Sequence, residues 1–261
     1  MNVRPKKNLG QHFLNDENIA LRIADTISGG EFPAASPLGA LPVLEIGPGM
    51  GVLTKYLLES GRPVTAIELD SESVTYLHRV YPSLNVIEAD FLKYDLSEIY
   101  SGQFALIGNY PYNISSQIFF KVLDNMDQIP VVSGMLQKEV AERICAAPGT
   151  KSRGILSVLL QAWYDCEYLF TVEPHVFTPP PKVRSGVLRL VRNSRTDLGV
   201  NPADFKLVVK TAFGQRRKTL RNSLSSLLQP GSPALESPLL AERPERLSVE
   251  QFIELTKLIR G

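Results

Sequence analysis

The sequence predicts an α/β fold built on a parallel sheet over residues 1–200, followed by a small helical C-terminal domain over residues 201–261. Three observations support this prediction. Short apolar strands alternate with helical patterns after residue 40, which is typical of βαβ units. A glycine-rich turn follows the first of these strands. Beyond Pro202 only helical patterns remain.

The N-terminal helix is expected first, because Asn15 and Asp16 are good N-caps and apolar residues follow at helical spacing through Ile27. Gly29–Gly30 should end this helix, and an exposed loop should follow over residues 33–39. The alternating region then predicts strands at 42–46, 63–69, 85–89 and 104–108, with helices around 53–57, 74–77 and 118–123.

The remaining elements complete this arrangement. We expect a fifth strand, two helices, two late strands and three C-terminal helices, in order at 131–136, 137–145, 155–163, 166–172, 187–191, 205–213, 220–228 and 249–259. A Pro-rich connection over residues 230–244 separates the last two helices.

Composition excludes several classes of protein. Of 261 residues, 44% are hydrophobic and 21% charged, which excludes wholesale disorder and collagen-like repeats. The net charge of +1 does not decide for or against a nucleic-acid partner, because only the distribution of charge does so. Two distant cysteines and three scattered histidines indicate reduced thiols and no metal site. With no secretory signal and no apolar run of membrane-spanning length, we expect a cytoplasmic protein without membrane association.

Glycines and acids mark one edge of the predicted sheet. Gly47 and Gly49 follow the first strand and precede a helix, where glycine allows positive φ and close approach of a ligand. Their G-x-G-x-G spacing differs from that of dinucleotide binders. Glu68 and Asp90 end the next two strands, and a carboxylate there can accept both hydroxyls of a ribose. The alternative is a tight turn beside two surface acids. Glu45 either holds the loop or faces a ligand amine.

The segment Asn109-Tyr110-Pro111-Tyr112 follows the fourth strand at the same edge and suits methylation of an exocyclic amine. The Asn109 side-chain oxygen and the Tyr110 carbonyl can accept the two amine hydrogens, since Pro111 favours an extended residue before it. Tyr112 offers a face on which a base can stack. No strong general base is needed. The alternative is a turn with packed tyrosines.

Taken together, these motifs resemble the small-subunit ribosomal RNA adenine N6,N6-dimethyltransferase family (KsgA type). The matching segments occur in order over nearly the whole chain, at residues 8–14, 45–49, 67–70, 108–115, 136–140, 177–183 and 213–224. The resemblance implies a Rossmann-like S-adenosylmethionine-dependent methyltransferase domain with a small helical C-terminal domain. It also implies S-adenosyl-L-methionine as methyl donor. The acceptors would be two adjacent adenosines in the 3′-terminal hairpin of 16S rRNA within the immature 30S subunit, with a role in subunit biogenesis.

The resemblance also assigns the site residues. The cofactor-binding set would be His12, Leu14, Glu45, Gly47, Gly49, Glu68, Asp90 and Asn109. The target base would lie against Asn109 and Tyr112, with Phe177 stacked on its other face. The family commonly has Asn at His12 and Leu at Tyr110. Only the backbone carbonyl of Tyr110 is required, so the second departure should be tolerated.

Basic side chains cluster in two segments that contain no acid. We expect RNA phosphate contacts from Lys182, Arg184, Arg216, Arg217, Lys218 and Arg221. The alternative for each cluster is a solvated helix face. A monomer is the expected oligomeric state.

Other functions remain open at this stage. The protein could be a small-subunit assembly factor for which methylation is dispensable. It could also be the related large-subunit methyltransferase of macrolide resistance, or a DNA adenine methyltransferase. The segments 213–224 and 247–252 resemble the small-subunit branch.

Overall fold

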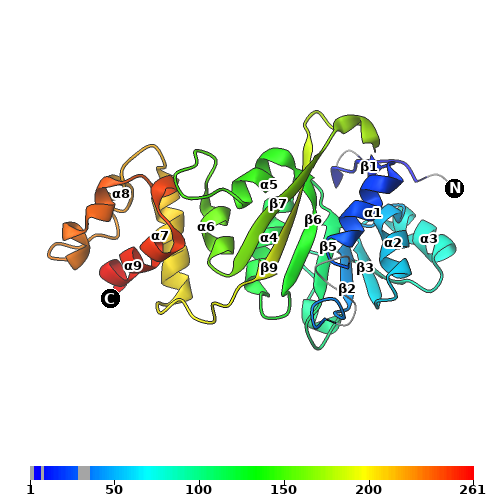
Figure 1. The fold of residues 1–261 in the computed structure, drawn as a ribbon, viewed down its shortest axis with the longest axis horizontal. Helices are drawn as coiled ribbons and strands as arrows, with labels where there is room; N and C mark the ends of the chain where they lie inside the picture. Colours follow the sequence, from blue (N-terminus) through cyan, green and yellow to red (C-terminus); the bar gives the residue numbers. More distant parts are fainter. Residues whose placement is uncertain (1–2, 7–8, 29–35) are drawn as a thin grey trace. The chain divides into compact units, whose positions relative to one another are not determined.

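The computed structural model describes residues 3–6, 9–28 and 36–261, and the chain forms two compact units (Figure 1). The first unit comprises the chain up to Ala141 together with Glu167–Val191, and the second comprises Glu142–Cys166 and Arg192–Gly261. The sequence suggested a single boundary at residue 200. The chain is instead divided discontinuously, because residues 142–166 pack with the C-terminal helices.

A seven-stranded sheet forms the centre of the first unit, in the order β4-β3-β2-β5-β6-β9-β7. Its strands are β2 (Val43–Ile46), β3 (Val64–Glu68), β4 (Asn85–Glu88), β5 (Ala105–Asn109), β6 (Val131–Gln137), β7 (Tyr164–Val172) and β9 (Ser185–Arg192). Neighbours from β4 to β6 run parallel, and β9 runs antiparallel to β6. All seven strands were predicted, with small shifts at their ends. Parallel pairing brings the carboxyl ends of β2, β3 and β5 to one edge.

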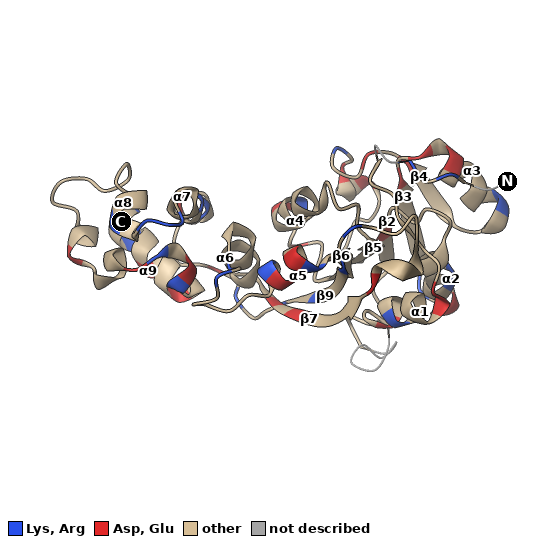
Figure 2. Ribbon diagram, turned by 90° about the horizontal axis from the view of Figure 1, so that it is seen from above, with Lys and Arg blue, Asp and Glu red and all other residues tan. Residues whose placement is uncertain are grey.

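Helices cover both faces of this sheet. They are α1 (Glu17–Asp25), α2 (Val52–Glu59), α3 (Ser71–Val80), α4 (Ser115–Asp124) and α5 (Lys138–Ile144), with short 3₁₀ turns at Leu96–Glu98 and Pro174–Val176. Figure 2 shows α4 on one side of the strands and α1 with α2 on the other. Every residue of β2 and β3 is buried, which explains why these strands are mostly apolar, with Glu45 and Glu68 as buried acids.

The start of α1 agrees with its predicted cap. The Asp16 side chain accepts a hydrogen bond from the Ile19 amide at 3.0 Å. The helix ends at Asp25, and Thr26 follows as its C-cap. The predicted stop at Gly29–Gly30 and the start of the predicted loop, residues 33–35, lie outside the described residues.

A small second sheet was not predicted. It consists of β1 (Phe13–Leu14) and β8 (Phe177–Thr178), which pair antiparallel with Leu14 opposite Phe177. Asn15 strengthens the junction, since its amide donates to the Val176 carbonyl at 2.8 Å. A strand of two residues carries too little alternation to be recognised in a sequence. The pairing fixes the segment before α1 against a segment far along the chain.

The second unit is helical and contains α6 (Ile155–Gln161), α7 (Pro202–Gly214), α8 (Leu220–Ser223) and α9 (Val249–Arg260), with 3₁₀ turns at Pro233–Glu236, Pro238–Ala241 and Pro244–Arg246. The predicted helix over 220–228 is shorter than expected. Arg153 is fully buried and donates to the Ala146 carbonyl at 2.5 Å and to the Leu247 carbonyl at 3.3 Å. These bonds, with the packing of α6 on α7 and α9, explain why residues 142–166 belong to this unit.

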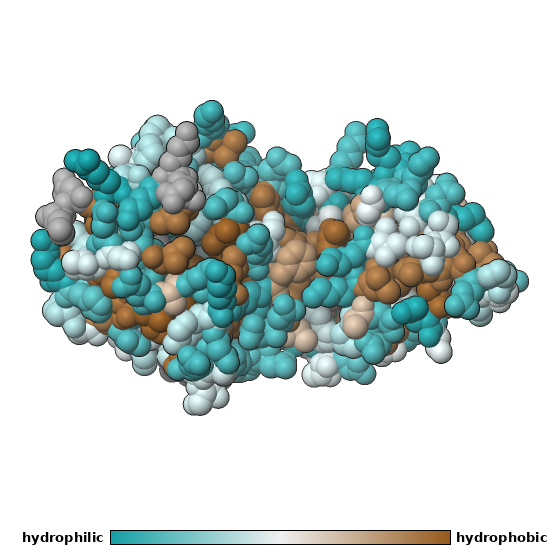
Figure 3. Space-filling view, turned by 180° about the vertical axis from the view of Figure 1, so that it is seen from behind, coloured by the Kyte–Doolittle hydropathy of each residue, from teal (hydrophilic) through white to brown (hydrophobic). Residues whose placement is uncertain are grey.

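The surface carries isolated apolar side chains. Figure 3 shows brown residues distributed among teal ones on the face that it displays. The exposed large apolar side chains come from separate elements: Leu21, Leu69, Val80, Val183 and Leu207. Within residues 3–6, 9–28 and 36–261, no helix has the length and apolar character needed to cross a membrane.

Candidate active site

A cavity of about 500 Å³ opens where β2, β3 and β5 end, and all of its described lining residues lie in the first unit. This volume is typical of a site for a small molecule. The lining includes eleven of the predicted cofactor-binding and catalytic residues: His12, Leu14, Glu45, Gly47, Gly49, Glu68, Asp90, Asn109, Tyr110, Pro111 and Tyr112. Segments from four strand ends and from the N-terminal region therefore meet at one place.

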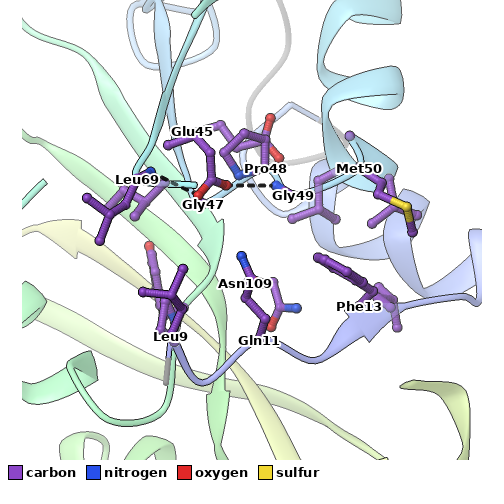
Figure 4. Close-up of a pocket in the computed structure, with 18 of the residues that line it drawn as sticks. Leu9, Gln11, Phe13, Glu45, Gly47, Pro48, Gly49, Met50, Leu69 and Asn109 are labelled. Carbon is purple, nitrogen blue, oxygen red and sulfur yellow. Dashed lines mark hydrogen bonds between the residues drawn. The ribbon is translucent and has the colours of Figure 1, made fainter. Parts of the chain in front are cut away.

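The glycine loop between β2 and α2 needs its glycines. Gly47, Gly49 and Gly51 have φ of 62°, 57° and 79°, a region that other residues rarely adopt. A Cβ on Gly49 would also lie 2.9 Å from the Phe13 ring. Figure 4 shows Gly47, Gly49, Phe13 and Asn109 around the cavity. The loop thus exposes its backbone to the cavity.

Glu68 is fixed by backbone amides at the end of β3. Its Oε2 accepts from the Gly49 amide at 3.1 Å, and its Oε1 accepts from the Leu69 and Asp70 amides, each at 2.9 Å. One of the dashed lines in Figure 4 ends at Gly49 and marks the first of these bonds. Burial raises the pKa of Glu68, and the three amides only partly offset this effect. The carboxyl group is therefore rigid, and the three amides leave it with remaining capacity to accept a hydrogen bond.

Glu45 lies deeper, on β2. Its side chain is 1% exposed, and its Oε2 accepts from the Thr54 hydroxyl on α2 at 2.6 Å. Burial raises the pKa of Glu45 to about 8, and the nearby Glu68 contributes in the same direction. Glu45 is therefore mostly protonated at neutral pH. The bond to Thr54 favours the interpretation in which Glu45 holds the loop.

Asp90 follows β4 and is more accessible than Glu45 and Glu68. Its Oδ1 accepts from the Leu92 amide at 2.9 Å, and its Oδ2 is 3.6 Å from the Lys93 ammonium group. The side chain remains 30% exposed. A polar ligand in the cavity can therefore reach this carboxylate.

Asn109 ends β5, and its amide orientation is fixed. Its Nδ2 donates to the His12 carbonyl at 3.0 Å. A carbonyl oxygen only accepts, so the NH₂ group must face His12 and the Oδ1 atom must face away from it. Asn109 therefore presents a hydrogen-bond acceptor beside the cavity.

Tyr110 lines the cavity although its ring is buried. The ring is 1% exposed, and its hydroxyl donates to the Ser133 carbonyl at 2.6 Å. It packs over two glycines, since a Cβ on Gly108 would lie 3.1 Å from the ring and one on Gly134 would lie 2.8 Å from it. The Tyr110 amide donates to the Met135 carbonyl at 2.8 Å. The side chain thus anchors the backbone on which the Tyr110 carbonyl sits.

The rings of Tyr112 and His12 face each other in the part of the cavity that residues 109–112 line. Their ring centroids are 5.5 Å apart with an interplanar angle of 30°. The Tyr112 hydroxyl and the Ser185 Oγ are joined by a hydrogen bond of 2.5 Å. The His12 Nδ1 lies 2.7 Å from the Pro179 carbonyl. Ser185 therefore holds the Tyr112 ring in place, and the Pro179 carbonyl holds the His12 ring.

Phe177 is the one predicted catalytic residue that the structure does not bring to the cavity. Its side chain is 2% exposed and packs in the core with Leu14, its partner across the β1–β8 pair. It is absent from the residues that line the cavity. The β8 pairing turns this ring into the interior, and its stacking on the target base stays a prediction.

An ion pair on the N-terminal segment was missed by the sequence analysis. Lys6 forms a salt bridge with Asp70 and lies 3.3 Å from Glu72, and its amide donates to the Gln11 Oε1 at 2.8 Å. Burial alone would raise the pKa of Asp70, but Lys6 and Ser73 hold it below its usual value. Asp70 directly precedes α3, and the sequence offers no local signal for its pairing with Lys6. The pair ties the N-terminal segment beside Glu68.

The charges around the cavity favour a positively charged ligand. Among the described lining residues the acids are Glu17, Glu45, Glu68 and Asp90, of which Glu45 is mostly protonated at neutral pH, whereas Lys55 is the single Lys or Arg. Lys55 is itself paired with Glu17 at 3.0 Å. No group of His, Cys, Asp and Glu among the described residues could hold a metal ion.

Comparison with known proteins assigns the family. The profile of the ribosomal RNA adenine dimethylase family matches residues 2–260. The chain belongs to this family. It is 62% identical to the ribosomal RNA small subunit methyltransferase A of Parabacteroides distasonis over 97% of this chain and 93% of that protein. Its identity to the protein of the same name in Phocaeicola vulgatus is 58%, over 99% of this chain and 91% of that one.

Solved structures agree on the fold. A dimethyladenosine transferase from Plasmodium falciparum matches with a TM-score of 0.76 and 24% identity, over 94% of this chain and 96% of that one. The 23S rRNA methyltransferase ErmE matches with a TM-score of 0.67 and 27% identity, over 95% of this chain and 100% of that one. The ribosomal RNA adenine dimethylase is thus a Rossmann-like methyltransferase, and S-adenosyl-L-methionine is its cofactor. The acidic lining of the cavity fits this positively charged molecule.

Proposed function

We propose that the protein dimethylates N6 of two adjacent adenosines in the 3′-terminal hairpin of 16S rRNA, within the immature 30S subunit in the cytoplasm. The observation that carries this proposal is the fixed amide of Asn109, which presents an acceptor at the edge of the sheet that also holds Glu68. Family membership and the names of the relatives support rRNA of the small subunit as substrate.

On the donor side, Glu68 and Asp90 would bind the two polar ends of the nucleoside. Glu68 would accept hydrogen bonds from the ribose hydroxyls, since three backbone amides already hold its carboxylate in place. Asp90 would accept from the adenine amine of the donor. His12, Leu14, Gly47 and Gly49 would complete the subsite. When bound, the donor supplies an electrophilic methyl group on a positively charged sulfur.

On the base side, two acceptors would activate the target amine. The lone pair of an adenine amine is delocalised into the ring, so the free amine is a poor nucleophile. The Asn109 Oδ1 and the Tyr110 carbonyl would bind its two hydrogens and favour a pyramidal nitrogen whose lone pair faces the methyl group. The excess proton then leaves to water. Alignment of the two reactants supplies most of the acceleration.

The RNA surface would include exposed basic side chains of both units. They are Lys182 and Arg184 in the first unit and Arg216, Arg217, Lys218 and Arg221 in the second. Three other basic residues of the segment 178–195, namely Arg189, Arg192 and Arg195, contact Glu167, the Trp163 carbonyl and Glu250 at 2.7, 2.5 and 2.9 Å and are less exposed. Arg184, Arg216 and Arg221 also have partners, in Glu173 and in the Lys151 and Leu235 carbonyls, but they stay exposed. Contacts from the exposed residues to phosphates would weaken as salt concentration rises.

The decisive experiment locates the methyl groups. Purified protein should transfer methyl groups from S-adenosyl-L-methionine to small subunits from a deletion strain, and mass mapping should find two adjacent dimethyladenosines in their 16S rRNA. Methylation of 23S rRNA or of DNA alone would refute the proposal. Gel filtration with light scattering tests the proposed monomer.

The same strain tests whether binding alone suffices for subunit assembly. Complementation with Asn109→Ala should leave the two adenosines unmodified. If subunit maturation is nevertheless fully restored, the main role of the protein is in assembly, and methylation is secondary.

A further inference from the structure

Ser185 is a buried serine that bonds to a residue of the cavity without lining the cavity itself. Its side chain is fully buried, and its Oγ shares a hydrogen bond of 2.5 Å with the Tyr112 hydroxyl. Tyr112 is among the described residues that line the cavity, whereas Ser185 is not. The two positions are 73 residues apart in the chain. Any effect of Ser185 on a ligand in the cavity would therefore act through the Tyr112 ring.

The backbone at Ser185 is held on both sides. Ser185 begins β9 and lies opposite Gln137 in the ladder between β6 and β9. The carbonyl of the preceding residue, Arg184, accepts from the Lys138 amide at 3.0 Å. At the next position a Cβ on Gly186 would lie 2.7 Å from a tyrosine ring of β7, so the strand is closely packed there. Ser185 therefore offers Tyr112 a bonding partner in a fixed position.

Tyr112 needs such an anchor, because its backbone lies in a turn and not in a strand or helix. Burial raises the pKa of its hydroxyl, and the bond to Ser185 only partly offsets this effect, so the group stays protonated at neutral pH. The ring contacts the His12 ring at a centroid distance of 5.5 Å. A bond at the far end of the ring restricts rotation about both side-chain torsions. Loss of this bond would give the Tyr112 ring more freedom to rotate.

We propose that Ser185 is a positioning residue for methyl transfer, because it holds the Tyr112 ring in the orientation against which the target adenine would lie. This inference rests on the proposed function and deepens it. Tyr112 belongs to the same short segment as Asn109, the residue that would bind the target amine. The exposed Lys182 and Arg184, which would contact RNA phosphates, lie directly before Ser185 in the chain. One segment would thus contact the RNA backbone and also fix the ring beside the base.

Two variants remove the bond from its two ends. Ser185→Ala removes one hydroxyl, and Tyr112→Phe removes the other but keeps the ring. In each variant, kcat/KM for small subunits from a deletion strain should fall about 3- to 10-fold, as expected for the loss of one hydrogen bond. The KM for S-adenosyl-L-methionine should not change. Ser185→Thr keeps a hydroxyl and should be clearly more active than Ser185→Ala.

The double variant separates positioning from a general loss of packing. If Ser185 acts through the Tyr112 hydroxyl, Ser185→Ala should lower kcat/KM no further once Tyr112→Phe is present. Ser157→Ala is the matched control, because Ser157 is a fully buried serine of the second unit whose hydroxyl donates to the Arg143 carbonyl. This control should lower the melting temperature and leave kcat/KM of the folded protein unchanged.

The inference is overturned if Ser185→Ala keeps the kcat/KM of the wild type, or if its effect is the same with and without Tyr112→Phe. It is also overturned if the donor KM rises instead, or if a folded Ser185→Thr is as impaired as Ser185→Ala. If Ser185→Ala melts too low for assay, Tyr112→Phe decides, and its full activity overturns the inference. A wild type that does not methylate small-subunit rRNA refutes the proposed function, and this inference with it.

Discussion

The two sides of the cavity are held in different ways. On the donor side, Glu68 is fixed by amides of its own loop and of the neighbouring glycine loop. On the base side, Asn109, Tyr110 and Tyr112 are fixed by side chains or carbonyls of elements distant in the sequence. The donor side is thus held mainly by backbone amides of the loops that follow β2 and β3. The base side depends on side-chain contacts with other elements of the fold. Substitutions should therefore affect donor and acceptor separately.

The largest effect is expected for Asn109→Ala. Loss of the acceptor beside the amine should lower kcat by about 100- to 1000-fold, a cost comparable to that of removing one polar group that stabilises a transition state. Melting temperature should be nearly unchanged, because Asn109 is only half-buried. Methyl transfer from S-adenosyl-L-methionine to small subunits measures the effect. Asn85→Ala is the control, because Asn85 is an exposed asparagine at the amino-terminal end of β4 and does not line the cavity. Undiminished dimethylation by Asn109→Ala would contradict the proposal that Asn109 binds the target amine.

A donor-side change should have the opposite kinetic signature. Glu68→Gln removes the charge that would bind the ribose hydroxyls, so the KM for S-adenosyl-L-methionine should rise about 10- to 100-fold. The KM for RNA should stay constant. Glu88→Gln is a matched control, because Glu88 is the exposed register partner of Glu68 on β4. An equal rise in both KM values would show that the two sides are not separable.

The buried Glu45 should make stability depend on pH. Its pKa in the folded state is about 8, above the ordinary value of 4.5, so the folded protein holds this proton more tightly than the unfolded chain. The resulting stabilisation is complete below pH 4.5 and is lost as pH rises toward 8. Between about pH 6 and pH 8 the wild type should lose about 2 kcal/mol relative to Glu45→Gln. Urea unfolding of both proteins at the two pH values measures this difference. If the free energy of unfolding changes equally with pH in both proteins, the prediction is wrong.

The smallest effect is expected for Tyr110→Phe. The variant keeps the ring over Gly108 and Gly134 but loses the bond to the Ser133 carbonyl, which should cost about 1 kcal/mol of stability. Because the hydroxyl only anchors the backbone, kcat should fall a few-fold while donor KM stays constant. Tyr168→Phe, whose hydroxyl bonds locally to Thr171, serves as the control. A normal kcat and stability in Tyr110→Phe would show that packing of the ring alone positions this segment.

The sequence was sufficient for the parts of the site that follow from local rules. Apolar runs located β2 to β6, and the parallel arrangement then placed Glu68 and Asp90 at one edge. It was insufficient for the β1–β8 pair, whose two-residue strands decide that the Phe177 ring faces inward. The contacts of His12 and Lys6 depend on partners more than 60 positions away, so no local pattern could reveal them.

The second unit consists of two separate segments, Glu142–Cys166 and Arg192–Gly261, and this affects the order in which the parts of the protein can fold during synthesis. Arg153 leaves the ribosome well before Leu247, a partner 94 residues further along the chain. Until that partner is synthesised, the guanidinium group lacks one of its buried acceptors and α6 lacks its covering helix α9. The strands from β2 to β6 are complete much earlier and can pair first. Vectorial synthesis therefore presents β2 to β6 early, supplies β7 to β9 later, and completes the helical unit last, with α9.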